Sequence, residues 1–140
     1  MASTSGIAPQ IPLSKLRFAG SGLKRPECVP ATARGALYTA DWRGGVAQTL
    51  PDGSQRLFTA SLPDGRPLKP NGIALRPDGS FLLADLGDTQ GGLFHLQRNG
   101  TVTPFVEEID GVAIPPSNYV VEDGKRTWLT VSTSHQPRAL

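Results

Sequence analysis

The stretch KPNGIALRPDGSFLLADLGDTQGGLFHL, residues 69–96, consists of short apolar runs that alternate with turn signals. A polar opening leads into GIAL, the turn PDGS follows, FLLAD comes next, and Gly91-Gly92 introduces LFHL. Short apolar runs bounded by Gly, Pro and Asp are typical of β-strands joined by tight turns. The stretch therefore predicts an antiparallel unit of short strands, and Asn71 stands where that unit opens.

The same pattern occurs three times along the chain, in residues 25–58, 69–106 and 114–133. Two sets of landmarks keep steps of 44 and 47 residues: the openings at Glu27, Asn71 and Asn118, and the strands that begin near Leu37, Phe81 and Trp128. A period in the forties with four short strands per unit is the signature of a β-propeller blade. A generic β-sandwich with similar hairpins is the alternative that the pattern leaves open.

Turn chemistry supports the strand assignment. PDGS at residues 51–54 and 77–80 places Pro, Asp and Gly where a tight turn needs a fixed φ, a local side-chain hydrogen bond and a positive φ. Asn99-Gly100 and Asp123-Gly124 are predicted as two-residue hairpin turns. The 16 Gly and 13 Pro in a chain of 140 residues fit many short strands rather than long helices.

The repeats predict an all-β fold with a defined domain organisation. Residues 1–19 form an N-terminal tail, and residues 20–140 form a partial β-propeller of about three blades, the third with about its first two strands. Because propellers close with about four to eight blades, this chain cannot close a ring alone. It would leave an open blade face at each end.

Charge and cysteine content exclude several classes of function. The 14 basic and 12 acidic residues are scattered, which argues against nucleic acid or a membrane surface as partner, since both need a concentrated positive patch. Cys28 is the single cysteine, so no internal disulfide forms and no Cys/His zinc motif exists. No signal-peptide pattern or apolar run of about 18 residues occurs, and a soluble cytoplasmic protein is expected.

The three blade openings are the strongest candidates for a functional site. In a propeller the first strand of each blade lines the central channel, so Glu27, Asn71 and Asn118 should converge at one mouth of it. Carboxylate and amide oxygens suit Ca²⁺, Mg²⁺, Mn²⁺, or Zn²⁺ in a carboxylate-rich shell. The alternative is that each Asn caps a turn and that Glu27 is solvated.

These motifs resemble the N-terminal half of the SMP-30/gluconolactonase/LRE family of six-bladed propellers. RPECVP (25–30) is similar to the family's opening motif, although the usual Glu-Gly/Ser-Pro is here Glu27-Cys28-Val29-Pro30. KPNGIALRPDG (69–79) is similar to the second-blade motif, and PPSNYVVEDGKRTWLTVST (115–133) to the next opening. The resemblance covers about residues 20 to 135.

The resemblance implies a fold, an activity and roles for four residues. The fold is a six-bladed β-propeller of which this chain supplies roughly the first three blades. Glu27 and Asn118 would be metal ligands, and Lys69 and Asn71 would contact substrate. The activity would be divalent-metal-dependent hydrolysis of a sugar or other small lactone, with Ca²⁺, Zn²⁺, Mg²⁺ or Mn²⁺ as cofactor. The family's general-base Asp lies outside this chain, so no catalytic residue can be named within it.

The resemblance also implies a partner. Activity would need a second propeller half, which is either another chain or a second copy of this one. The alternative function is a non-catalytic propeller segment that acts as a ligand-binding or scaffold module.

The histidines and serines offer little support for another chemistry. His95 lies in the predicted strand GLFHLQ and is expected to be a surface or hydrogen-bonded strand residue. His135 is expected in a loop, and Ser132 and Ser134 lie outside any Gly-x-Ser-x-Gly motif.

Further polar and aromatic residues follow the repeat. Asp41 and Asp85 end matching strands, where hydrogen bonding to neighbouring backbone is favoured over metal ligation. Asp88, in GDTQGG, could reach over the channel as part of a specificity loop. Trp42 and Trp128 are expected to pack between blades or against the rim.

Overall fold

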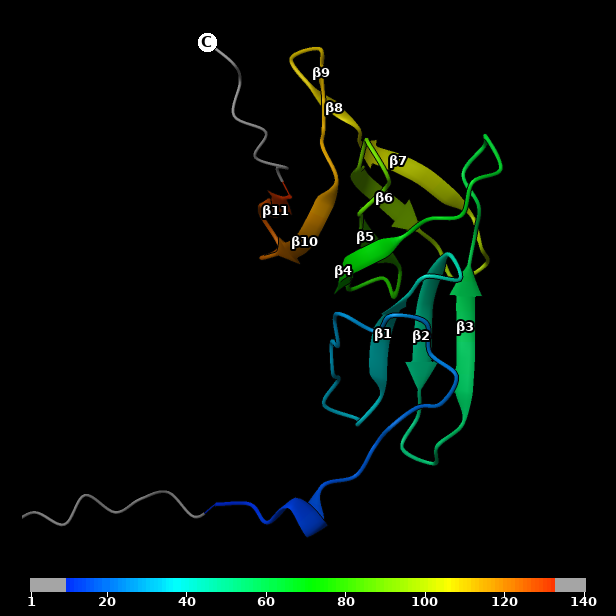
Figure 1. Ribbon diagram of the computed structural model, residues 1–140, viewed down its shortest axis with the longest axis vertical. Coiled ribbons are helices and arrows are strands. Elements are labelled where there is room, and N and C mark those ends of the chain that lie inside the picture. Colours follow the sequence, from blue (N-terminus) through cyan, green and yellow to red (C-terminus); the bar gives the residue numbers. More distant parts are fainter. Residues whose placement is uncertain (1–9, 133–140) are drawn as a thin grey trace, which may run out of the picture.

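The computed structural model describes residues 10–132, and strands dominate them (Figure 1). The elements are η1 (Leu13–Lys15), β1 (Leu37–Asp41), β2 (Gly45–Thr49), β3 (Gln55–Thr59), β4 (Pro70–Leu75), β5 (Phe81–Asp85), β6 (Gly92–Leu96), β7 (Val102–Val106), β8 (Glu108–Ile109), β9 (Val112–Ala113), β10 (Ser117–Glu122) and β11 (Thr127–Val131). The predicted all-β class is confirmed. His135 lies outside the described residues.

The first blade consists of the antiparallel sheet β1-β2-β3 and an irregular inner segment, residues 24–31. Backbone hydrogen bonds join this segment to β1 at alternate positions: Tyr38 N to Pro30 O (2.9 Å), Ala40 N to Cys28 O (3.2 Å) and Trp42 N to Lys24 O (2.9 Å). Pro26 and Pro30 have no N–H to donate, which prevents a regular ladder. The segment nevertheless takes the place of the innermost strand.

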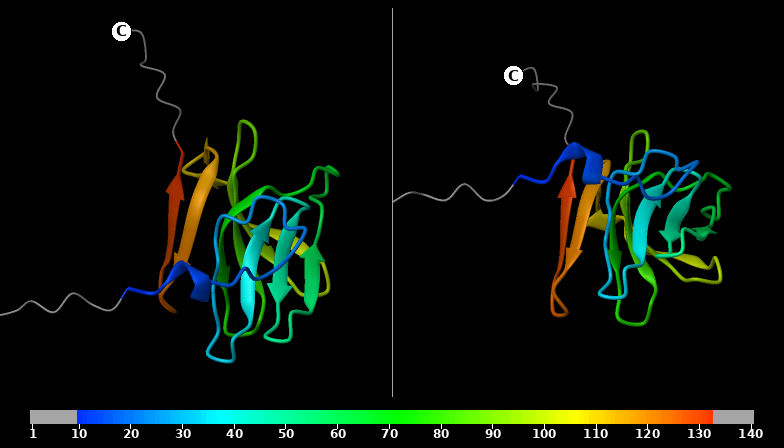
Figure 2. Two further views of the ribbon diagram at one scale, coloured as in Figure 1. Left: turned by 60° about the horizontal axis from the view of Figure 1, so that its bottom comes forward. Right: turned by 90° about the horizontal axis from the view of Figure 1, so that it is seen from below.

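The second blade is complete, and the third has its first two strands. The second is the four-stranded antiparallel sheet β4-β5-β6-β7, and the third is the pair β10-β11. The short hairpin β8-β9, which the sequence patterns did not predict, lies in the connection between them. The blades stand side by side with their inner strands β4 and β10 in contact (Figures 1 and 2).

Two apolar clusters hold the blades together. The larger joins blades 1 and 2 and contains Cys28, Tyr38, Ala40, Val46, Phe58, Leu62, Leu68, Ile73, Phe81, Leu83, Phe94 and Leu96. The smaller joins blades 2 and 3 through Leu82, Ala84, Leu93 and Val120. Opposite faces of β5 therefore supply the two clusters, Phe81 and Leu83 on one side and Leu82 and Ala84 on the other.

Five turns share one construction, at residues 32–36, 50–54, 62–66, 76–80 and 97–101. In each, the fourth residue is a glycine with φ between +80° and +92° whose N–H donates to the carbonyl of the first residue. The PDGS turns are thus confirmed, whereas Asn99-Gly100 belongs to this longer turn and not to a two-residue hairpin. A two-residue loop does occur in the third blade, with Gly124 and Lys125 between Asp123 and Arg126.

Strand pairing corrects one landmark of the repeat. Leu75 pairs with Phe81 in blade 2, and Glu122 pairs with Thr127 in blade 3. Thr127, and not Trp128, is therefore the equivalent of Phe81. The turn of blade 3 is one residue shorter than that of blade 2, so the second strand repeats after 46 residues while the inner strand repeats after 47.

The segment before the first blade covers the outward face of that blade. Residues 10–19 contain only the three-residue helix η1, and the chain then crosses the sheet toward Lys24 (Figure 1). Ser21 bonds to the Gln55 side chain through its N–H (3.0 Å) and its hydroxyl (2.9 Å).

Within the described residues, no helix is long and apolar enough to cross a lipid bilayer.

Candidate functional site at the blade openings

Asn71 and Asn118 occupy the same structural position in successive blades. In blade 2 the pairing register shifts between Pro70 and Gly72, and in blade 3 it shifts between Ser117 and Tyr119. Each asparagine is thus the extra residue of a β-bulge at the start of an inner strand. Bulges redirect a side chain that regular pairing would point elsewhere.

The two bulges bring the asparagine side chains together. Asn71 Nδ2 donates hydrogen bonds to the backbone carbonyl of Asn118 (3.1 Å) and to its Oδ1. Asn71 is 8% exposed, whereas Asn118 is open to solvent. Asn71 Oδ1 is buried and has no hydrogen-bond partner, which is costly for an amide oxygen. The pair thus combines a buried oxygen that lacks a partner with a solvent-exposed asparagine.

Contacts just inside the openings show that the three inner strands converge. The Cys28 thiol donates to Ile73 O at 3.6 Å, and its sulfur lies 3.6 Å from Tyr119 Oη. These three residues lie one or two positions after Glu27, Asn71 and Asn118, respectively. The hydrogen bond with Cys28 is the main cause that raises the pKa of the Tyr119 phenol above its ordinary value. The three blades therefore open toward one mouth.

Glu27 lies at this mouth but is engaged by its own loop. Its Oε1 accepts a hydrogen bond from Arg25 Nε at 2.9 Å, and both side chains are more than 40% exposed. A pair this exposed contributes little to stability and can be broken at small cost. The structure thus brings Asn71 and Asn118 together directly, while the Glu27 carboxylate is turned toward Arg25.

The openings could contribute part of a metal site. Glu27 and Asn118 supply hard oxygen donors, and the unpaired Asn71 Oδ1 adds an acceptor that lacks a donor. In the part of the chain that the structure describes, no group of three His, Cys, Asp or Glu residues could hold a metal. These residues would therefore suit a cation only if its remaining ligands came from outside the described residues.

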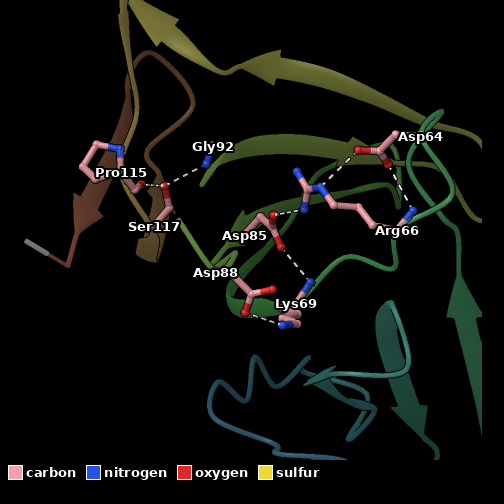
Figure 3. A network of polar contacts seen from close by, with 8 residues as sticks. All are labelled: Asp64, Arg66, Lys69, Asp85, Asp88, Gly92, Pro115 and Ser117. Atoms are coloured by element: carbon pink, nitrogen blue, oxygen red, sulfur yellow. Dashed lines mark hydrogen bonds and ion pairs between the residues drawn. The ribbon is translucent and has the colours of Figure 1, made fainter. Parts of the chain in front are cut away.

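Lys69 is positioned beside these openings by Asp85, which ends β5 (Figure 3). The fully buried Asp85 carboxylate accepts hydrogen bonds from the Lys69 backbone N–H (2.6 Å) and from Arg66 Nη1 (2.8 Å). The predicted structural role of Asp85 is therefore confirmed. Arg66, which the sequence patterns did not single out, supplies the positive charge that a buried carboxylate needs.

Lys69 and Asp88 form an ion pair at the edge of a polar pocket. Lys69 Nζ lies 2.6 Å from Asp88 Oδ1, and the Asp88 side chain is 83% exposed (Figure 3). The pocket has a volume of about 520 Å³, and its lining includes Asp64, Arg66, Lys69, Asp88 and Glu107. Both cationic and anionic side chains line it. Such a lining suits a polar, hydroxyl-rich molecule better than an apolar one.

Asp41 repeats this arrangement in blade 1. It is fully buried, accepts a hydrogen bond from the Lys24 backbone N–H (3.1 Å) and pairs with Arg43 (2.7 Å). Burial alone would raise the pKa of the Asp41 carboxyl, but the hydrogen bonds from Arg43 and the Lys24 N–H outweigh burial and hold it below its ordinary value. The predicted role of Asp41, hydrogen bonding to neighbouring backbone, is thus confirmed, and its contacts are structural.

Trp42 lies on the rim, where a packing role was predicted. The Arg25 guanidinium stacks 4.1 Å from the centre of its ring, and Lys69 Nζ lies 5.9 Å away. Trp42 Nε1 is buried without a partner, like Asn71 Oδ1. The mouth therefore holds both of the buried unpaired side-chain atoms found among residues 10–132, one donor and one acceptor. Trp128, in contrast, is 57% exposed on blade 3.

His95 lies at the opposite end of blade 2. Its Nε2 is 2.7 Å from Ser80 Oγ, and that hydroxyl donates to Asp78 at 2.6 Å. Because Ser80 lies between the other two residues, this is not the order of a nucleophilic triad, in which the histidine is central. The predicted role of His95 as a hydrogen-bonded strand residue is confirmed.

Comparisons with known proteins support the fold. No family model matches the chain, and no curated protein matches it. Among solved structures, the chain is similar to a catalytically inactive variant of virginiamycin B lyase from Staphylococcus aureus, crystallised with quinupristin. The TM-score is 0.56 at 13% sequence identity, over 79% of this chain and 36% of that chain.

This likeness shows the fold alone, because the sequence identity is low. Together with the stacked antiparallel sheets, it establishes that the chain forms part of a β-propeller. The chain spans little more than a third of the length of that neighbour.

Proposed function

We propose that this chain is part of a propeller enzyme that hydrolyses a sugar or other small lactone with the help of a divalent metal ion. The observation that carries the proposal is the Asn71–Asn118 pair, which sits at equivalent bulges and includes a buried oxygen without a partner. The motifs at residues 25–30, 69–79 and 115–133 add a resemblance to the SMP-30/gluconolactonase/LRE family. The propeller neighbour is itself a lyase, so a related fold carries an active site.

The proposed reaction opens a cyclic ester. Water adds to the carbonyl carbon, the bond from that carbon to the ring oxygen breaks, and the ring oxygen takes a proton to give a hydroxy acid. A bound divalent cation would supply stabilisation of the negative charge that develops on the carbonyl oxygen. A general base must take the proton from water, and it would come from the rest of the propeller.

Residues of this chain would bind and orient the substrate. Glu27 and Asn118 would hold the cation, Glu27 after it releases Arg25. Asn71 would contact the substrate or a metal-bound water once its side chain, with its buried Oδ1, turns out of the contact with Asn118. Lys69 would contact substrate oxygen atoms, with Asp88 holding its ammonium in place until substrate enters. The polar pocket favours a sugar lactone over an apolar one.

A second candidate function is a non-catalytic ligand-binding or scaffold module. The observation that favours it is the ion pair between Arg25 and Glu27, because the Glu27 carboxylate that would bind a metal is already bonded to Arg25. The pocket at Lys69 and Asp88 would then bind a polar ligand without chemistry.

Lactone assays on the complete assembly separate the two candidates. The enzyme should hydrolyse a sugar lactone with a rate that a chelator abolishes and added Mn²⁺ or Ca²⁺ restores, and Asn118→Ala should lower that rate at least about tenfold. Asp123→Asn, in an exposed turn, is the control. Turnover that is insensitive to the chelator, or no turnover in a metal-loaded assembly, would contradict the proposal.

A further inference from the structure

Arg25 lies at the rim of the mouth in a backbone conformation that few residues adopt. Its φ is +49°, and among residues 10–132 the only other non-glycine residue with a positive φ is Asp110 (+52°). The left-handed region is sterically unfavourable for a residue with a Cβ atom. Such strain persists only where surrounding contacts fix it, which is common at ligand-binding positions. The Arg25 side chain is therefore a candidate for a binding function.

The Arg25 guanidinium is held on an aromatic ring. Its central carbon lies 4.1 Å from the centre of the Trp42 ring, a distance typical of a cation–π contact. Lys69 Nζ lies 5.9 Å from the same ring, so two cations gather at one indole. The Trp42 indole also carries the buried N–H donor that has no partner. Positive groups therefore concentrate around Trp42.

Most hydrogen-bond donors of Arg25 are unused. A guanidinium has five N–H groups. In the described structure only Nε donates, to Glu27 Oε1 at 2.9 Å, and neither Nη group has an acceptor among residues 10–132. The side chains of Arg25 and Glu27 are 43% and 44% exposed. Glu27 thus takes one donor of a group that can bind a carboxylate through two parallel hydrogen bonds.

Each of the two cations at Trp42 is paired with a carboxylate of this chain. Arg25 pairs with Glu27, and Lys69 Nζ lies 2.6 Å from Asp88 Oδ1 (Figure 3). Both carboxylates are solvent-exposed, so a ligand can displace either one at small cost. Glu27 differs from Asp88 because it is also a ligand of the proposed metal site. Metal binding would therefore change the partner of Arg25.

We propose that Arg25 binds the carboxylate of a sugar acid, and that Arg25 becomes available when Glu27 turns away to hold the divalent cation. The inference rests on the proposed function, because the proposed cation is what separates Glu27 from Arg25. After this change Arg25 keeps its contact with Trp42 but loses its only ion-pair partner among the described residues. A carboxylate of the ligand replaces that partner.

The chemistry of lactone opening supplies such a carboxylate. Hydrolysis converts a neutral ester into a carboxylic acid, which is ionised at neutral pH. Because Arg25 and Glu27 are in contact, a cation on Glu27 and a carboxylate on Arg25 would be neighbours at the mouth. A lactone that carries a second, free carboxylate presents the same group before the reaction. Both sources need the same interaction with the guanidinium.

The inference predicts that the cation and the carboxylate bind cooperatively. Each removes an obstacle to the other, so each should raise the affinity for the other by the same factor. The measurement is isothermal titration calorimetry of the complete assembly with D-gluconate, with and without saturating Mn²⁺. D-Gluconate should bind about tenfold or more tightly when Mn²⁺ is present. D-Glucitol, in which a hydroxymethyl group replaces the carboxylate, should show no such dependence.

Variants of Arg25 separate this contact from direct binding of the carboxylate to the metal. In Arg25→Gln the effect of Mn²⁺ on D-gluconate affinity should fall below about twofold. Mn²⁺ alone should bind this variant about twofold to fivefold more tightly, because Glu27 has lost its competing partner. Arg25→Lys keeps the charge but not the planar donors, so it should retain part of the effect.

Two further variants control for stability and charge. Arg25→Gly removes the guanidinium and also relieves the positive φ, so it should repeat the Arg25→Gln result without loss of stability. Arg34→Gln removes an equal charge from an exposed turn, residues 32–36, and should leave both affinities unchanged.

Kinetic constants of the active assembly distinguish the two sources of the carboxylate. If the carboxylate belongs to the product, Arg25→Gln should raise the inhibition constant of D-gluconate and leave the KM of D-glucono-1,5-lactone unchanged. If the substrate also carries one, the variant should raise the KM of D-glucaro-1,4-lactone, which has a free carboxylate. Either result supports the inference.

Two results would overturn the inference while the proposed function survives. An equal effect of Mn²⁺ in the parent and in Arg25→Gln would mean that the carboxylate binds the cation itself. D-Gluconate binding that Mn²⁺ does not change in the parent would mean that Arg25 keeps Glu27. In both cases Mn²⁺ would still bind the parent and bind Asn118→Ala more weakly. An assembly that binds no Mn²⁺ would overturn the proposed function and this inference together.

Discussion

Asp41 and Asp85 are the same residue in successive blades, each fully buried at the end of the second strand and each bonded to a lysine backbone N–H. Each also pairs with an arginine, but Arg43 lies two residues after Asp41, while Arg66 reaches Asp85 from the preceding connection. The buried aspartate therefore recurs in both blades, whereas the arginine that pairs with it comes from a different place in the chain in each blade. These two carboxylates fix the start of each inner strand and so the orientation of the mouth.

Replacing Asp85 with Asn should destabilise the fold. The amide can still accept the Lys69 N–H, but Arg66 loses its buried charged partner and keeps only the exposed Asp64 (3.4 Å), so the free energy of unfolding should fall by about 2 kcal/mol. Asp88→Asn, which removes an exposed ion pair from the same pocket, is the matched control and should cost less than about 1 kcal/mol. Urea denaturation measures both. Equal losses would show that burial of Asp85 has no energetic consequence.

Asp41 should make stability depend on pH in the acid range. Its pKa in the folded state lies below the ordinary value of 3.8, so the folded protein binds fewer protons than the unfolded chain there. The stabilisation is fully present above about pH 5 and is lost as pH falls through the lowered pKa. Asp41→Asn should flatten this dependence between about pH 5 and pH 2 in denaturation curves. An unchanged slope would mean that other carboxylates dominate acid unfolding.

Arg98 closes the end of the first core that is remote from the mouth. Its guanidinium lies 5.0–5.4 Å from the ring centres of Tyr38, Phe58 and Phe81, and it donates to Tyr38 Oη (3.0 Å) and Gly79 O (2.7 Å). Arg98→Ala should lower the free energy of unfolding by about 2 kcal/mol. The exposed Arg34→Ala should have almost no effect in the same thermal denaturation series. A silent Arg98 variant would rule out this aromatic contact as a stabilising one.

Gly72 sets the spacing between blades 2 and 3. A Cβ atom there would lie 2.6 Å from Tyr119 Cα and 3.0 Å from the Asn118 carbonyl oxygen. Gly72→Ala should therefore separate β4 from β10, break the Asn71–Asn118 hydrogen bonds and cost about 1–3 kcal/mol. Chemical shifts of the two asparagine side-chain amides would report the change.

Gly53→Ala provides the comparison for Gly72. A Cβ at Gly53 meets nothing within 4 Å, and only the strained φ of +84° opposes the substitution. This variant should lose about 1 kcal/mol and leave the asparagine amide signals in place. Shifted asparagine signals in Gly53→Ala as well would mean that the mouth responds to instability in general.

The strands and most turns could be predicted because their signals are local. Alternating apolar runs and the Pro-Asp-Gly turns each encode their own geometry within five or six residues, so β1, β2, β5 and β6 lie where the sequence placed them. The innermost segment of blade 1 was harder, because Pro26 and Pro30 remove the donors that make a strand recognisable. The register error at Trp128 came from a turn shortened by one residue, which hydrophobicity alone does not reveal.

The candidate site could be predicted only in part. Asn71 and Asn118 occupy equal positions in the repeat, and this was enough to place them at one mouth, because successive blades repeat the same backbone geometry. The orientation of the Glu27 side chain depends on its ion pair with Arg25, two residues away. The repeat pattern does not predict this pair. Arg66 and the unpaired Trp42 Nε1 also required the structure, since both depend on contacts between distant segments.

The most direct test of the central claim is titration of the ¹⁵N-labelled chain with Mn²⁺, within the complete assembly, followed by nuclear magnetic resonance. The account predicts selective broadening of the side-chain amide signals of Asn71 and Asn118 and of the backbone signal of Glu27, and loss of this broadening in Asn118→Ala. Broadening confined to the exposed acidic positions Asp64, Asp88 and Glu108 would contradict it, because the cation would then bind surface carboxylates and not the blade openings.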